Sequence, residues 1–415
     1  MTQTLFSKNF VFLILGQLTS LFGNFILKLA LSLYVLEATG SAAVFAGILS
    51  AATIPAIVFS PFGGILADRA DKRNIMAGLD TLAGISVLCA ALVLSEKNSV
   101  IVTGVLLIIL SVLGAFETPV VQACIPAMLE GGNIMKGNAV VNQAASLSCL
   151  AAPVSGGVLY AAFGLKPVMY ASVVCFFVTA LLECFIQLHD RRPQSKGNVL
   201  SIVKEDFISS MRYIAKEQTS ILKMLLLTAF SRFFVMGIVI VGLPFLVRTV
   251  LGLNARYYGA AESLLAIAAI AGSIVAGLLT ERLKIRKLSI IITSIGIFII
   301  PAGIAFLLPV SSVVKYTITV VSLCGMQIAI SIFSVFAVSL IQQRTPDAII
   351  GKVMAYTSTL TLCVQPMGQI VYGFLFDRFR QAVSVIFIPT GVILCVIGLS
   401  AAGLFQRMEK ERQSR

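Results

Sequence analysis

Residues 288–306 read LSIIITSIGIFIIPAGIAF, a stretch without a single charged side chain. It is about as long as the roughly 20 apolar residues with which an α-helix crosses a membrane. Continuous apolar runs also stand at 102–112 and 383–405. Within lipid, only helices and closed barrels satisfy every backbone N–H and C=O group. Barrel strands alternate apolar and polar residues, and these runs do not, so we expect membrane-spanning helices.

The amino-acid composition is typical of a membrane protein. Hydrophobic residues make up 58% and charged residues 12% of its 415 positions, and the mean hydropathy is +0.99. Soluble domains have about 45–50% apolar and about 25% charged residues. The first apolar run, 10–36, is too long for a signal-peptide core and lacks a following cleavage-like segment. It is therefore expected to be the first span of an all-α membrane protein.

Charges and turn residues divide the apolar runs into twelve expected spans. Their ranges are 10–36, 42–67, 74–94, 100–123, 138–163, 167–188, 221–250, 256–280, 288–308, 316–340, 352–376 and 381–405. The loops on the side of both termini carry roughly three times as many Lys and Arg residues as the other loops, which predicts cytoplasmic termini. The formal net charge of +13 follows from this bias, so no nucleic-acid partner is expected.

An internal repeat runs through the sequence. Gly64-Ile-Leu-Ala-Asp-Arg and Gly277-Leu-Leu-Thr-Glu-Arg are separated by 213 residues, and the same offset relates Pro153 to Pro366. This constant offset predicts two homologous six-helix bundles, a design that places a substrate site between the halves.

The predicted bundles cover 1–188 and 221–415, joined by a cytoplasmic linker at 189–220. Apolar side chains recur at helical spacing in this linker and predict an amphipathic helix on the membrane surface, although an ordinary connector helix explains them as well. These residues are Val199, Val203, Phe207, Met211 and Ile214.

The loop after the second predicted span carries a candidate gate. Gly64 permits a close helix approach, and Asp68 can neutralise the N-terminus of a helix from the other half. The basic residues nearby are potential partners for Asp80 or Glu117, and the positive-inside bias explains two of them equally well. It does not explain the Gly-x-x-x-Asp spacing or its second copy. The candidate gate residues are Gly64, Asp68, Arg69, Lys72, Arg73, Gly277, Glu281 and Arg282.

This loop resembles the signature loop of the major facilitator superfamily, Gly-x-Leu-x-Asp-Arg-x-Gly-Arg-Arg/Lys. One position departs from that pattern, because Asp71 stands where the family usually has Gly. The form with Asp71, together with Thr39-Gly-Ser41, is similar to the branch of macrolide efflux proteins and the enterobactin exporter. The resemblance implies the major facilitator fold, with twelve helices in two pseudo-repeats.

The fifth predicted span contains Ser148-Cys-Leu-Ala-Ala-Pro-Val-Ser-Gly-Gly157. This segment resembles the superfamily's exporter motif, Gly-x-x-x-Gly-Pro-x-x-Gly-Gly, with Ser148 and Ala152 in place of two glycines. Pro153 bends the helix, and Gly156 and Gly157 allow tight packing between the halves. General packing of small residues is the simpler alternative. The resemblance implies export.

Ionisable side chains within spans are costly, so each is a candidate functional residue. Lys28, Glu117, Arg232 and Glu262 stand out. Because the family architecture makes spans one and eight neighbours, and likewise four and seven, the expected pairs are Lys28–Glu262 and Glu117–Arg232. Alternatively, each charge contacts water alone. Further polar residues expected in the cavity are Gln17, Asn24 and Gln327, while Glu183 is expected at the membrane interface.

The remaining chemistry-bearing residues predict no catalysis. The eight cysteines stand mostly within apolar runs without a CxxC pair, which is typical of small core residues. We find no phosphate loop, metal-spaced cluster or nucleophile elbow, so we expect no enzyme activity, cofactor or metal.

The sequence therefore predicts a proton-driven exporter of small amphiphilic or hydrophobic molecules, such as a macrolide-like drug or a siderophore. Its expected partners are the substrate, protons and the lipid bilayer. We expect a monomer in a bacterial plasma membrane, working by rocker-switch alternating access. Two alternatives stay open, because a fold does not fix a function: a lysophospholipid flippase, and a membrane receptor or scaffold without transport.

Overall fold

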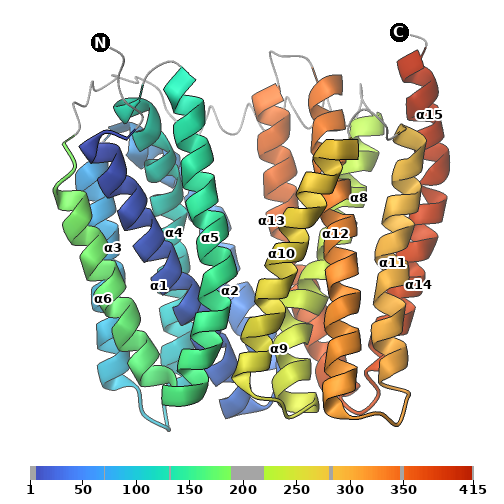
Figure 1. Ribbon diagram of the computed structural model, residues 1–415, viewed down its shortest axis with the longest axis horizontal. Helices are drawn as coiled ribbons and strands as arrows, with labels where there is room; N and C mark the ends of the chain where they lie inside the picture. Colours follow the sequence, from blue (N-terminus) through green and yellow to red (C-terminus); the bar gives the residue numbers. More distant parts are fainter. Residues whose placement is uncertain are drawn as a thin grey trace. The chain divides into compact units, whose positions relative to one another are not determined.

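The structure is a computed structural model that describes residues 6–69, 71–129, 132–187, 219–279, 284–345 and 350–413. Across these ranges the regular secondary structure is helical, and twelve helical segments are long and apolar enough to cross a membrane. The predicted twelve-span, all-α fold is thereby confirmed (Figure 1). The predicted amphipathic helix around Phe207 lies outside the described residues.

The first six spans are single helices. Their bounds are α1 Lys8–Thr39, α2 Ala42–Arg69, α3 Lys72–Val93, α4 Ser99–Met128, α5 Gly132–Phe163 and α6 Leu165–Cys184. The Ser7 hydroxyl caps the start of α1 by accepting a hydrogen bond from the Phe10 N–H at 3.3 Å. At its end, Gly40 adopts the left-handed conformation that closes many helices (φ 61°).

The second half differs from the prediction in two spans. The expected helix 221–250 consists of α8 (Thr219–Met236), a π-helical turn η1 (Gly237–Gly242), the short α9 (Leu243–Phe245) and a second π-helical turn η2 (Leu246–Val250). Pro244 at the start of α9 donates no backbone hydrogen bond. The last predicted span comprises α14 (Ser384–Ser400) and α15 (Ala402–Gln413). The other helices are α10 Ala255–Leu279, α11 Leu288–Ala305, α12 Ser312–Arg344 and α13 Ile350–Arg378.

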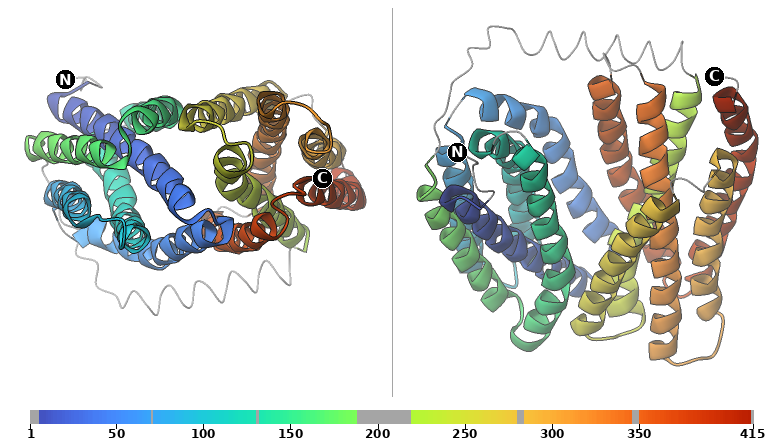
Figure 2. Two further views of the ribbon diagram at one scale, coloured as in Figure 1. Left: turned by 90° about the horizontal axis from the view of Figure 1, so that it is seen from below. Right: turned by 45° about the horizontal axis from the view of Figure 1, so that its top comes forward.

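The chain divides into two compact units. The first comprises Met1–Ser195 together with Val247–Thr249 and Asn254–Ser263. In it α1 packs on α5 and α6, α2 packs on α4, and α3 packs on α4 and α6 (Figure 2). Gly23 of α1 lies so close to Cys175 that an added Cβ would meet the Cys175 Cβ at 2.7 Å. This close approach packs α1 tightly on α6.

The second unit comprises Lys196–Leu246, Val250–Leu253 and Leu264–Arg415. Here α11 packs on α12 and α14, and α13 packs on α8 and η1. Its buried core includes Leu288, Ile292, Phe333 and Phe405.

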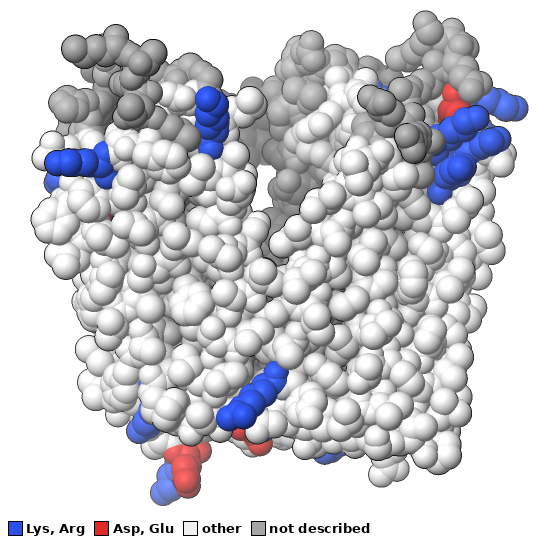
Figure 3. All heavy atoms as spheres, viewed as in Figure 1, with Lys and Arg blue, Asp and Glu red and all other residues white. Residues whose placement is uncertain are grey.

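Charged side chains follow the pattern expected of spanning helices. On the face shown in Figure 3, the Lys, Arg, Asp and Glu side chains lie near the two ends of the helices, and other residues make up the band between them. Large apolar side chains such as Ile101, Leu278 and Leu399 are exposed, as lipid-facing positions require.

Candidate functional site

A row of polar side chains runs along one face of α1. Gln17, Ser20, Asn24 and Lys28 follow one another at three- and four-residue spacing, which places them on the same side of a helix. Gln17 and Ser20 are buried, whereas the Lys28 side chain is exposed. The Gln17 amide nitrogen and the Asn24 side-chain oxygen are buried without a hydrogen-bond partner in the described structure.

Three carboxylic acids face this row from the neighbouring helices. They are Asp80 of α3, Glu117 of α4 and Glu183 of α6. The Ser20 hydroxyl donates a hydrogen bond to Oδ1 of Asp80 at 2.9 Å. Glu117 lies beside Gln17 and Ser20 and interacts electrostatically with Lys28. We call Asp80, Glu117 and Glu183 the acid cluster.

Two members of the acid cluster are unusually placed for carboxyl groups. Asp80 is 1% exposed and Glu183 is 0% exposed, and the two groups lie side by side. Oδ2 of Asp80 and both side-chain oxygens of Glu183 are buried without a hydrogen-bond partner in the described residues. Glu183, which the sequence placed at the membrane interface, is thus buried within the protein, because α6 turns this residue inward against α1 and α3.

One of the two predicted ion pairs, Lys28–Glu262, is not formed in the described structure. Lys28 lies near Glu117, and Glu262 accepts a hydrogen bond from the Tyr258 hydroxyl at 2.6 Å. Within the described part of the chain, Lys28 and Glu262 form no ion pair. The pairing of Glu117 with Arg232, which belongs to the second unit, stays a prediction, and Gln327 is half-buried in α12.

An ion pair unforeseen from the sequence stands at the end of α1. Glu37 binds Arg248 of η2, whose Nε donates to Oε1 of Glu37 at 3.0 Å. The Tyr160 hydroxyl of α5 donates to Oε2 of the same carboxylate at 2.7 Å. Glu37 and Arg248 lie near the ends of their spans, where charges are common, so no pattern in the sequence pointed to this network.

The exporter-like segment of α5 packs tightly on α10. A Cβ added to Gly157 would lie 2.8 Å from the Ala255 carbonyl oxygen, and one added to Gly259 would collide with the Pro153 carbonyl oxygen. The Ser263 hydroxyl of α10 donates to the Leu150 carbonyl oxygen at 2.7 Å. These contacts require glycine at positions 157 and 259. Gly156 of the same segment faces Ile26 of α1, whose Cα would lie 3.3 Å from an added Cβ.

The candidate gate is described only in part. The side chains of Asp68 and Arg69 lie outside the described part of the structure, as do Glu281 and Arg282. Asp71, the residue that departs from the family pattern, caps α3 by accepting from the backbone N–H groups of Arg73 at 3.1 Å and Asn74 at 3.4 Å. A polar N-cap is a signal that the sequence already contained.

Two further observations refine the gate hypothesis. Arg73 donates to the Asn74 side chain, while Asp80 belongs to the acid cluster. The pairing of the basic gate residues with Asp80 or Glu117 stays a prediction. The close approach of α2 to α4 lies at Gly63, where an added Cβ would be 2.6 Å from the Ala115 carbonyl oxygen. At Gly277 an added Cβ would meet no atom within 4 Å.

Within the described residues, twelve apolar helical segments, a lysine on α1 and carboxylic acids on the helices around it define a polytopic membrane protein of the transporter class. Residues 13–365 match the Major Facilitator Superfamily, and the chain belongs to this family.

Two macrolide efflux proteins are similar in sequence to this chain. The chain is 24% identical to macrolide efflux protein A of Streptococcus pyogenes, an alignment that covers 92% of this chain and 93% of the relative. It is 25% identical to macrolide efflux protein A of Enterococcus faecalis over 76% of this chain and 95% of the relative.

Solved structures show the same fold at lower identity. The nucleoside transporter NupG aligns with a TM-score of 0.72 at 13% identity, covering 96% of this chain and 98% of that chain. A bacterial homologue of the iron transporter ferroportin in its inward-facing state aligns with a TM-score of 0.72 at 16% identity, covering 95% and 98%.

Proposed function

We propose that the protein is a secondary exporter that moves small amphiphilic or hydrophobic molecules out of the cell in exchange for protons. Membership of the major facilitator superfamily and similarity to two macrolide efflux proteins support transport and efflux. Alternating access of the bundles 1–188 and 221–415 about the linker 189–220 is the mechanism that we propose.

The acid cluster is the observation that carries the proton coupling. An ionised carboxylate only accepts hydrogen bonds, so Asp80 and Glu183 can bind each other only when one of them holds a proton. Glu117 joins this pair to Lys28, which belongs to the same polar face of α1. A proton gained or lost here changes the charge of the cluster, and thereby its attraction for Lys28. We propose Glu117 as the exchanging group, with Glu262 as a second candidate.

The packing of α5 on α10 supports the outward direction. Gly157 and Gly259 bring the two helices into backbone contact beside Pro153, and the segment resembles the exporter motif. We further propose that Asp68, with Gly64 and Arg69, forms the cytoplasmic gate and that Glu281 and Arg282 form its second copy. The proposed setting is a bacterial plasma membrane, with a monomer whose termini are both cytoplasmic.

The test uses purified protein in proteoliposomes, with erythromycin as the probe. Vesicles with the cytoplasmic side outward and an acidic lumen should accumulate erythromycin, because protons leaving the lumen drive the exchange. Protein-free vesicles correct for passive trapping of this weak base. Glu117→Gln should abolish the protein-dependent part, and the exposed control Glu96→Gln should leave it unchanged.

Enterobactin and lysophosphatidylglycerol serve as further probes in the same vesicles. Protein-dependent movement of lysophosphatidylglycerol alone would replace drug or siderophore export with the flippase alternative. If none of the three probes responds to the pH gradient, the proposal of proton-driven export is wrong.

A further inference from the structure

A cavity of about 320 Å³ lies within the second unit, between α8, α12 and α13. Each helix contributes a face at three- and four-residue spacing, so the lining follows from helix geometry. The polar side chains of the lining include Arg232, Ser334, Thr357, Ser358, Thr361 and Gln365. The lining contains no carboxylate.

Arg232 is the only charged residue among those that line this cavity. The Arg232 side chain is exposed. It forms no ion pair within the described residues. A guanidinium is permanently charged and presents five N–H donors in a planar fork. Within a membrane span, such a group marks a binding or transport site by default.

Some of the other polar side chains already donate a hydrogen bond within their own helix, and others do not. Thr228 and Thr357 donate to the carbonyls of Met224 and Val353, each at 2.9 Å, and Thr361 donates to the Thr357 carbonyl. These threonine hydroxyls have already used their hydrogens within the helix. By contrast, Ser334, Ser358 and Gln365 make no such bond in the described structure and keep their donors for a ligand.

The geometry points to an anion-binding subsite: Arg232, with Ser334, Ser358 and Gln365, binds a carboxylate or phosphate group of the transported molecule. A cavity lined by one guanidinium and several neutral donors, without a carboxylate, is suited to binding an oxyanion. The inference rests on the proposed transport function and adds amphiphiles that carry an acidic group to its expected substrates.

Binding to the purified protein in nanodiscs tests this subsite apart from transport. The probes are laurate, dodecyl phosphate and dodecyltrimethylammonium, which share a chain length and differ in charge. Laurate and dodecyl phosphate distinguish the two oxyanions, and we expect at least one of them to bind more tightly than the cation. Arg232→Gln should weaken that binding about tenfold or more, since hydrogen bonds to charged groups are the strong ones.

Two variants separate charge from folding. Arg232→Lys keeps the charge and should retain part of the affinity, and Ser358→Ala should cause a smaller loss than Arg232→Gln. Lys287→Gln, which removes an exposed charge elsewhere in the second unit, is the control. Equal affinity for the anions and the cation, or anion binding unchanged in Arg232→Gln, overturns the subsite. Neither result bears on proton-driven export, which the vesicle assay decides.

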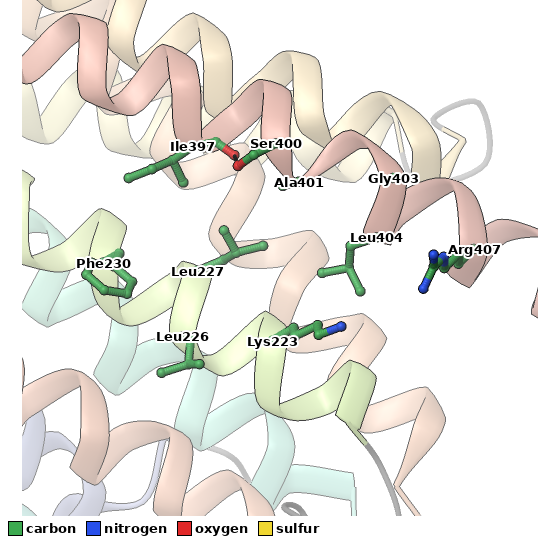
Figure 4. A pocket seen from close by; sticks show the side chains of 10 residues that line it. All are labelled: Lys223, Leu226, Leu227, Phe230, Ile397, Ser400, Ala401, Gly403, Leu404 and Arg407. Carbon is green, nitrogen blue, oxygen red and sulfur yellow. Dashed lines mark hydrogen bonds between the residues drawn. The ribbon is translucent and has the colours of Figure 1, made fainter.

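A second, independent feature is a groove of about 580 Å³ between α8 and α14–α15 (Figure 4). Leu226, Leu227, Phe230, Ile397 and Leu404 form its apolar part. Two cationic side chains, Lys223 and Arg407, lie together at one end of the groove, while Phe230 and Ile397 lie toward the other (Figure 4). In the first unit the corresponding helices α1 and α6 pack directly on each other.

We infer that this groove binds an anionic phospholipid of the surrounding bilayer. Its acyl chain would lie on the apolar side chains, and its phosphate would lie between Lys223 and Arg407. Basic pockets between spanning helices bind acidic headgroups in this way, and the long basic side chains reach toward the headgroup level.

Thermal unfolding in nanodiscs tests the lipid site. Phosphatidylglycerol added to phosphatidylcholine should raise the Tm of the wild type, and the double variant Lys223→Gln/Arg407→Gln should lose at least half of that rise. The control Lys284→Gln/Lys287→Gln removes the same charge at exposed positions and should keep it. Equal rises in both double variants overturn the site, as does an equal rise with free glycerol phosphate.

Discussion

Ser20 of α1 donates a hydrogen bond to Asp80 of α3 across 2.9 Å, and this bond satisfies only one oxygen of the carboxyl group. The other oxygen is buried with the Glu183 carboxyl as its neighbour. A buried acceptor without a donor costs about 1–3 kcal/mol. A single proton held between Asp80 and Glu183 would supply the missing donor.

The first prediction concerns this shared proton. If the folded protein holds this proton, which the unfolded chain releases at neutral pH, stability should fall as the pH rises. Glu183→Gln replaces the proton with a permanent amide donor, and its Tm should depend less on pH than that of the wild type. Differential scanning fluorimetry in nanodiscs measures both profiles. Glu96→Gln is the control, and parallel profiles for all three proteins would contradict the shared proton.

The second prediction concerns the partner of Lys28. Because Lys28 lies near Glu117, the double-mutant cycle Lys28→Ala/Glu117→Ala should show a coupling of about 0.5–3 kcal/mol in stability. The cycle Lys28→Ala/Glu262→Ala should be additive within about 0.5 kcal/mol, because Glu262 bonds to Tyr258 instead. A larger coupling energy for Lys28 with Glu262 than for Lys28 with Glu117 would contradict this prediction and support the Lys28–Glu262 pair predicted from the sequence.

The third prediction concerns the backbone contact between α5 and α10. Gly259→Ala places a methyl group against the Pro153 carbonyl oxygen, and the forced shift should cost about 1–3 kcal/mol. Erythromycin export should fall with it. Gly78→Ala is the matched control, because an added Cβ there meets no atom within 4 Å, and it should gain roughly 0.5–1 kcal/mol as helical Gly→Ala changes do. Similar Tm values for the two variants would show that the contact is not tight.

The fourth prediction concerns the gate. If the charge of Asp68 holds the cytoplasmic side shut in one state, Asp68→Asn should cut transport severely while expression stays near normal. Asp71→Asn is the control, since Asn caps a helix about as well as Asp and should preserve both. Asp71→Ala should lose about 1 kcal/mol of stability with the cap. Wild-type export by Asp68→Asn in the vesicle assay would remove Asp68 from the mechanism.

The sequence predicted the spans well, because lipid imposes long apolar helices with few exceptions. The runs expected at 10–36 and 100–123 correspond to α1 and α4. The seventh span was predicted at 221–250 and is found there, but its π-helical turns were not predicted, since hydropathy does not register how a backbone winds. In η1, Gly237 packs closely on the ring of Tyr372 and Gly242 on the ring of Phe376. These tertiary contacts occur at the first π-helical turn.

The candidate site was predicted less completely. Lys28 and Glu117 were found because a charge within an apolar run is visible in the sequence. Glu183 stands near the end of its run, where a charge normally faces water, and only the packing of α6 on α1 and α3 shows that it is buried. Which carboxyl groups lie next to each other depends on how each helix is rotated about its axis. This rotation cannot be predicted from a single sequence.

The two π-helical turns of the seventh span also set the direction of the side chains beyond them. A π turn contains one residue more than the α turn that it replaces, so the side chains that follow Gly237–Gly242 and Leu246–Val250 point in other directions than they would on a continuous α-helix. The segment Thr219–Val250 is thus wound differently from α1, and the direction from which Arg248 reaches Glu37 depends on this winding.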